Sequence, residues 1–126
     1  MSTKVAVLGV LIDVVTMAEA VAKLEQFIEE KMPHVVATAN AEMVMLAQED
    51  RELAAILRKA RLVVPDGAGV VWAAKRQGYT RIERVTGYDL AQNLLAEAAK
   101  KGYRVFMFGS QPDIVAQAKT MAEACY

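Results

Sequence analysis

Short apolar runs alternate along this chain with longer segments of helical spacing, and this alternation limits the fold more than any other feature. The runs are apolar throughout rather than at every second position, as expected for strands buried on both faces. They lie at Val5–Val10, with Leu11–Val15 as an extension or a second strand, and at His34–Thr38, Leu62–Val64 and Tyr103–Phe108. The pattern predicts an α/β fold whose open, mostly parallel, Rossmann-like sheet carries helices on both faces.

The segments between these runs carry the start and stop signals of helices. Thr16 and Glu19 form a capping-box sequence, and Asn40 and Asp50 are further N-cap residues. Helices are predicted from Thr16 to about Lys31, from Asn40 to Arg61 with a restart at Asp50, over Val70–Gly78 and Asp89–Lys101, and from Pro112 onward.

One stretch, Arg61–Val70, places a carboxylate where a predicted strand ends. Pro65 closes the apolar run, and Gly67 and Gly69 permit a tight turn before the next helix. Ligands of open α/β sheets bind at such strand ends, so Asp66 is a candidate functional residue. The alternative is that Asp66 caps the helix that follows.

Right-handed crossovers bring the carboxyl ends of parallel strands to one edge, where three polar turns should meet. Thr38 with Asn40, Asp66 with Gly67, and Gly109 with Ser110 follow the predicted strands. Asp66 could take a proton from a substrate hydroxyl, while Thr38 and Asn40 could bind a sugar or hold Asp66. Gly109 and Ser110 precede a helix and form a candidate anion cradle.

Arg84 lies on a polar connector ahead of Thr86 and could neutralise a phosphate leaving group. Each of these site residues also has a structural alternative. Thr38 and Asn40 could cap a helix, Gly109 could be a plain turn, and Arg84 could be a solvated loop residue.

Composition excludes several classes of function. Fifteen basic and fifteen acidic residues cancel, which argues against a general nucleic-acid binder. Hydrophobic residues make up 55% of the chain, but the longest apolar run, Val5–Ile12, is too short to span a membrane and does not resemble a signal peptide. With Cys125 and His34 as the only residues of their types, neither an internal disulfide nor a structural zinc site is expected, and a reducing cytoplasm fits best.

Four blocks of residues together resemble the WecG/TagA/CpsF glycosyltransferases. They are Thr38–Glu42, Val64–Val71, Glu83–Leu90 and Val105–Gly109, and their order and spacing fit from about Leu8 onward. The resemblance implies a bacterial inverting enzyme with a GT-E-like fold that needs no metal. It would move an N-acetylmannosamine-type sugar from a UDP-sugar to polyprenyl-diphosphate-linked N-acetylglucosamine, in the synthesis of wall teichoic acid or a related polymer.

The resemblance also assigns roles by position. Asp66 matches the proposed catalytic base of the family, Thr38 and Asn40 match polar residues beside it, and Arg84 matches an arginine implicated in activity. The sequence departs from the family pattern at Ala68, Tyr88 and Ser110, where a bulkier residue, a small residue and a second glycine are respectively common.

Family members are roughly twice as long as this chain, so we expect residues 1–126 to be the N-terminal part of one longer α/β catalytic domain. The remaining part would complete the nucleotide pocket and supply a basic segment that meets the inner face of the cell membrane. Alone, this chain should be inactive, and its uncovered apolar surface should favour self-association into a homo-oligomer. Two alternatives remain, a non-catalytic nucleotide- or phosphate-binding module and an assembly scaffold.

Overall fold

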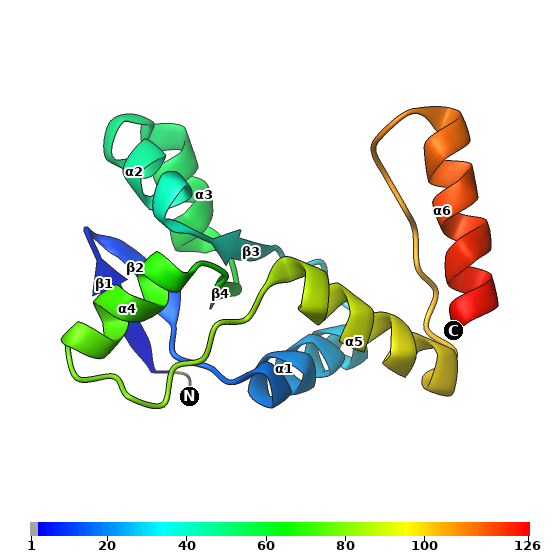
Figure 1. Ribbon diagram of the computed structural model, residues 1–126, viewed down its shortest axis with the longest axis horizontal. Helices are drawn as coiled ribbons and strands as arrows, with labels where there is room; N and C mark the ends of the chain where they lie inside the picture. The colour runs from blue at the N-terminus through cyan, green and yellow to red at the C-terminus, as the bar shows by residue number, and fades with distance from the viewer. Residues whose placement is uncertain (1–2) are drawn as a thin grey trace. The chain divides into compact units, whose positions relative to one another are not determined.

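The computed structural model describes residues 3–126 and has a mixed α/β fold (Figure 1). The chain divides into two units, Met1–Leu90 and Ala91–Tyr126, with the boundary inside one helix. The strands of the described chain are β1 (Lys4–Val7), β2 (Val10–Asp13), β3 (Val36–Ala39) and β4 (Leu62–Pro65). The helices are α1 (Met17–Glu30), α2 (Ala41–Glu49), α3 (Arg51–Lys59), α4 (Ala68–Arg76), α5 (Gly87–Lys101) and α6 (Pro112–Cys125).

The first apolar run is a hairpin rather than one strand of a parallel sheet. The chain reverses at Leu8 and Gly9, which both have positive φ angles, of 47° and 83°. Two consecutive positive φ angles are typical of the two-residue turns that join antiparallel strands. Accordingly β1 and β2 pair antiparallel, with Lys4 opposite Asp13. The prediction of a mostly parallel sheet is therefore wrong for this part of the chain.

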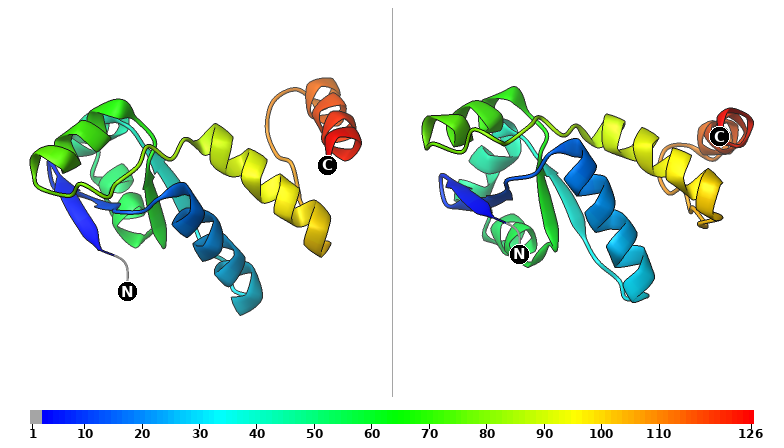
Figure 2. Two further views of the ribbon diagram at one scale, coloured as in Figure 1. Left: turned by 60° about the horizontal axis from the view of Figure 1, so that its bottom comes forward. Right: turned by 90° about the horizontal axis from the view of Figure 1, so that it is seen from below.

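Strands β3 and β4 form the parallel pair that the sequence predicts, and they run side by side (Figure 2). Their register places Val36 opposite Leu62 and Ala39 opposite Pro65. Pro65 is the last residue of β4, so the strand ends there as predicted, and the Pro65 carbonyl accepts a hydrogen bond of 2.8 Å from the Val85 N–H. The parallel sheet of the described residues has these two strands, which is narrower than the predicted one.

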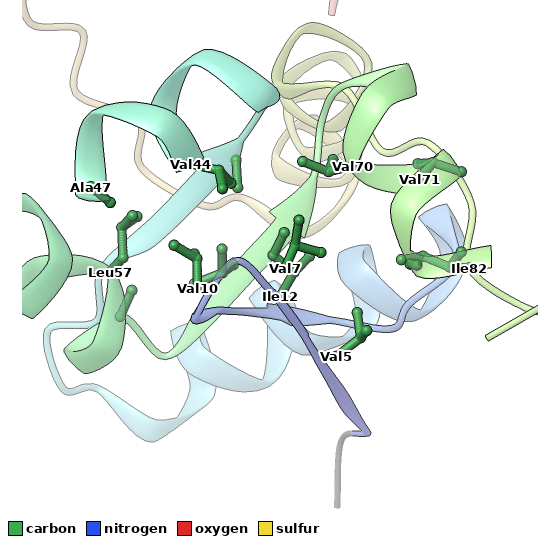
Figure 3. Close-up of a cluster of buried hydrophobic side chains, with 14 residues drawn as sticks. Val5, Val7, Val10, Ile12, Val44, Ala47, Leu57, Val70, Val71 and Ile82 are labelled. Atoms are coloured by element: carbon green, nitrogen blue, oxygen red, sulfur yellow. The ribbon is translucent and has the colours of Figure 1, made fainter. Parts of the chain in front are cut away.

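The core of the first unit lies around the hairpin (Figure 3). Side chains of β1 and β2 gather between those of α2 and α3 on one side and those of α4 on the other. The buried cluster consists of aliphatic residues, namely Val5, Val7, Val10, Ile12, Ala39, Val44, Ala47, Leu57, Ala60, Val63, Val70, Val71, Ala74 and Ile82. This packing fixes β4, and with it the residues that follow β4.

One carboxylate, Asp13 at the end of β2, is completely buried. Its Oδ2 accepts a hydrogen bond of 2.8 Å from the backbone N–H of Val63 in β4. Its Oδ1 accepts no hydrogen bond and lies 3.7 Å from the Lys4 Nζ. Asp13 therefore ties the hairpin to the strand that leads to Asp66.

Helix α1 begins with the predicted capping box. The Thr16 Oγ1 accepts a hydrogen bond from the Glu19 N–H, and the Glu19 Oε1 accepts one from the Thr16 N–H, both 3.2 Å long. Hydrogen bonding to the side chain and backbone of Thr16, with a smaller effect of nearby Arg81, lowers the pKa of Glu19. Because this pKa is lower in the folded state, ionised Glu19 favours folding at neutral pH. That contribution is lost as the pH falls through the lowered pKa.

Replacing Thr16 by alanine should lower the free energy of unfolding by about 1 kcal/mol, because the first turn of α1 loses its cap. Urea unfolding at pH 7 measures this change. Thr80 provides a matched control, since its exposed side chain forms no hydrogen bond within residues 3–126. Equal losses for Thr16→Ala and Thr80→Ala would contradict the assignment of the cap.

The second unit contains the rest of α5, a connecting segment and α6. Residues 103–108, predicted as a strand, are not a strand, because no segment within residues 3–126 pairs with their N–H and C=O groups. Phe106 and Phe108 are 88% and 94% exposed. Among the helices of the described chain, none combines the length and apolar character needed to cross a membrane.

Candidate functional site

The carboxyl ends of β3 and β4 bring together residues that lie far apart in the sequence. Thr38 is opposite Val64 in the parallel register, so Asn40 and Asp66 leave neighbouring strands at the same edge. A Cβ built on Gly67 would lie 3.2 Å from the Asn40 Cβ, which shows how closely the two turns approach. The predicted meeting of these two turns is confirmed, and we call this place the Asp66 edge.

Asp66 is half-buried and is held by three hydrogen bonds. Its N–H donates to the Ala39 carbonyl at 2.9 Å, and its own carbonyl accepts from the Arg84 Nε at 3.0 Å. Its side-chain Oδ2 accepts a hydrogen bond of 3.3 Å from the N–H of Gly87, which is the first residue of α5. Oδ1 has no hydrogen-bond partner in the part of the chain that the structure describes.

The alternative that Asp66 caps the next helix is wrong. The N-cap of α4 is Gly67, and no side chain hydrogen-bonds to the first turn of that helix. Asp66 contacts the start of α5 instead, 21 residues further along the chain. One oxygen is thus fixed by a helix N-terminus, and the other remains available to a ligand.

Arg84 contacts the backbone of Asp66 and lies on the connector that runs beside the end of β4. Its side chain is exposed, and only its Nε is used, in the bond to the Asp66 carbonyl. No carboxylate within residues 3–126 forms an ion pair with it. The Nη groups can therefore bind an anion close to Asp66.

Thr38 and Gly87 complete the close contacts at this edge. A Cβ built on Gly87 would lie 3.0 Å from the Thr38 Cγ2 and 3.6 Å from the Asp66 Oδ2. The half-buried Thr38 side chain therefore packs against the start of α5, beside the carboxylate. Gly87 was not predicted as a site residue, although one signal was present in the sequence, since this glycine directly follows the helix-capping Thr86.

Asn40 caps a helix, which was the structural alternative given for it above. Its Oδ1 accepts a hydrogen bond of 2.8 Å from the Met43 N–H, as the N-cap of α2. The side chain is exposed at the Asp66 edge. A role in substrate binding is compatible with this cap and stays a prediction.

Gly109 and Ser110 belong to the second unit and do not follow a strand. Both have positive φ angles, of 121° and 58°, so serine occupies a backbone conformation that favours glycine. The strand that was expected to carry them to the Asp66 edge is not formed in the described chain. Their role as an anion cradle stays a prediction.

Metal-ligating side chains do not gather anywhere in the described part of the chain. Residues 3–126 contain no group of three or more His, Cys, Asp or Glu side chains placed to hold a metal ion.

Comparison with known proteins gives consistent results. The family described as "Glycosyl transferase WecG/TagA/CpsF family" matches residues 5–126. A protein of Bacillus subtilis (strain 168), named N-acetylglucosaminyldiphosphoundecaprenol N-acetyl-beta-D-mannosaminyltransferase, is 32% identical over 91 residues. A protein of the same name from Bacillus spizizenii (strain ATCC 23059 / NRRL B-14472 / W23) is 33% identical over 91 residues.

Both matches cover 72% of this chain, but only 36% and 35% of the two relatives, so the chain spans about a third of the curated relatives that it matches. The match to the family covers nearly every residue that the structure describes, including the whole Asp66 edge. The chain belongs to the WecG/TagA/CpsF family of glycosyltransferases.

Proposed function

We propose that this chain carries the general base of an inverting glycosyltransferase. The enzyme would transfer an N-acetylmannosamine-type sugar from a UDP-sugar to N-acetylglucosamine linked to undecaprenyl diphosphate. The observation that carries the proposal is the Asp66 carboxylate, which has one oxygen bound to the Gly87 N–H and the other free. The sugar and the acceptor are taken from the names of the two Bacillus relatives.

The proposed reaction is a single displacement. A hydroxyl of the acceptor sugar gives its proton to the Asp66 Oδ1 as its oxygen bonds to the anomeric carbon of the donor. The bond between that carbon and the diphosphate oxygen breaks, and UDP leaves from the opposite face. One displacement inverts the anomeric configuration. Thr38 would orient the acceptor or the carboxylate.

The leaving diphosphate needs positive charge close to Asp66. The Arg84 Nη groups are free for this role. The first turn of α4 begins at the same edge, with no acidic residue in it and no side-chain cap on its N–H groups. Such a helix start favours phosphate binding. Arg84 and α4 would together stabilise the departing charge.

The wider setting of the site is also part of the proposal. β3 and β4 would belong to a larger open, Rossmann-like parallel sheet that further segments of the catalytic domain complete. Because undecaprenyl diphosphate is anchored in lipid, the enzyme would act in the cytoplasm at the inner face of the cell membrane. Residues 1–126 alone should then show no sugar transfer.

The test is a transfer assay with the intact natural protein, UDP-N-acetylmannosamine and a polyprenyl-diphosphate N-acetylglucosamine acceptor. Mass spectrometry should detect one added N-acetylhexosamine, and NMR of the product should show an inverted anomeric configuration. A retained configuration would contradict the single displacement. Binding of UDP by calorimetry without any transfer would favour the alternative, a nucleotide-binding module without catalytic activity.

A further inference from the structure

We propose that Gly87 is a positioning residue, whose backbone N–H orients the Asp66 carboxylate and whose missing side chain leaves room for Thr38. Its N–H donates to the Asp66 Oδ2 at 3.3 Å, across 21 residues of sequence. This role rests on the proposed function, because it gives Asp66 a geometry that matters for proton transfer.

Position 87 requires glycine because there is little room for a side chain at the Asp66 edge. The backbone conformation of the position does not itself require glycine. Gly87 does not have a positive φ angle, unlike Gly9, Gly78, Gly102 and Gly109. Other residues can therefore adopt its backbone conformation. Alanine also forms helices better than glycine. The contact with Thr38 is different, since a Cβ on Gly87 would lie only 3.0 Å from the Thr38 Cγ2. Real Cβ atoms rarely come so close to another atom, so one of the two residues would have to move.

The hydrogen bond gives the carboxylate a defined orientation. With Oδ2 held by the first N–H of α5, Oδ1 is the oxygen left for a substrate proton. The positive end of the α5 helix dipole faces the ionised carboxylate and favours this arrangement. Thr38 is β-branched, which restricts its χ1 rotamers, so it has few ways to make room for a new side chain. A side chain at position 87 would therefore disturb Thr38 and Asp66 together.

The first test is Gly87→Ala in the intact natural protein. A shift of a few tenths of an ångström at the reacting groups should lower kcat by roughly 10- to 100-fold, with little change in the KM for the donor. Thr80→Ala is the control, because it changes an exposed side chain that forms no hydrogen bond within residues 3–126 and has no role at the Asp66 edge. We expect Thr80→Ala to keep the wild-type kcat.

A second substitution should reverse the effect. Thr38→Ser deletes the Cγ2 methyl but keeps the hydroxyl, so the Gly87→Ala/Thr38→Ser protein should have a higher kcat than Gly87→Ala alone. The activity of Thr38→Ser serves as the reference of this double-mutant cycle. Additive losses, or a Gly87→Ala enzyme with wild-type kcat, would overturn the proposed role of Gly87.

A spectroscopic measurement tests the same contact without activity. In NMR spectra of the intact protein, the Gly87 amide resonance should shift when Asp66 is replaced by asparagine, because the charge on its hydrogen-bond acceptor is removed. Unrelated amides, such as that of Gly78, should keep their positions. An unchanged Gly87 amide resonance would overturn the positioning role of Gly87. A changed resonance in an intact protein that has no transferase activity would reject the proposed function and leave the positioning contact standing.

Discussion

Asp66→Asn in the intact natural protein is expected to lower kcat for sugar transfer by about 10²- to 10⁴-fold, the range typical for loss of a general base. The KM values for donor and acceptor should change far less. Asparagine has nearly the same size as aspartate, and its amide oxygen can still accept the hydrogen bond from the Gly87 N–H. What it cannot do is take a proton from the acceptor hydroxyl.

Asp50 offers a matched control for this substitution. It is an exposed aspartate that accepts a hydrogen bond of 3.0 Å from the Leu53 N–H as the N-cap of α3. Asparagine caps helices as well as aspartate does, so Asp50→Asn should preserve both stability and activity. Turnover close to wild type in the Asp66→Asn protein would reject Asp66 as the base. A matched fall in both variants would indicate a general effect of the lost charge.

Features that depend on neighbouring residues were predictable from the sequence. The capping box of Thr16 and Glu19 and the caps at Asn40 and Asp50 all form as predicted, because each hydrogen bond spans three residues. The parallel pairing of β3 and β4 was predictable for a related reason. Two short apolar runs joined by helices leave a right-handed crossover as the favoured connection.

Features that depend on distant partners were not predictable in the same way. The turn at Leu8 and Gly9 places leucine at a positive φ angle, which no local preference favours. Residues 103–108 have the composition of a strand, but a strand also requires a partner. The sequence likewise placed Asp66 at a strand end without indicating its bond to Gly87.

Asp13 has the same kind of long-range role, which the residues around it in the sequence did not indicate. Its Oδ2 is bound to Val63, three residues before Asp66, so the carboxylate fixes β4 from the side of the hairpin. Val63 is itself 1% exposed, and water cannot replace a lost partner of its N–H. Unsatisfied buried donors of this kind are costly to folding.

Asp13→Ala should therefore lower the free energy of unfolding by about 2 to 3 kcal/mol, the cost of an unpaired buried N–H together with the small cavity left behind. Lys4 would add little to this loss, because its side chain is 38% exposed and can turn into solvent. Asp50→Ala is the matched control in urea unfolding, since it removes a carboxylate that also accepts one backbone hydrogen bond, but at an exposed helix cap. That change should cost about 1 kcal/mol. Equal losses in the two variants would show that the burial of Asp13 does not matter. A larger loss for Asp13→Ala would identify this carboxylate as a main anchor of the strand that presents Asp66.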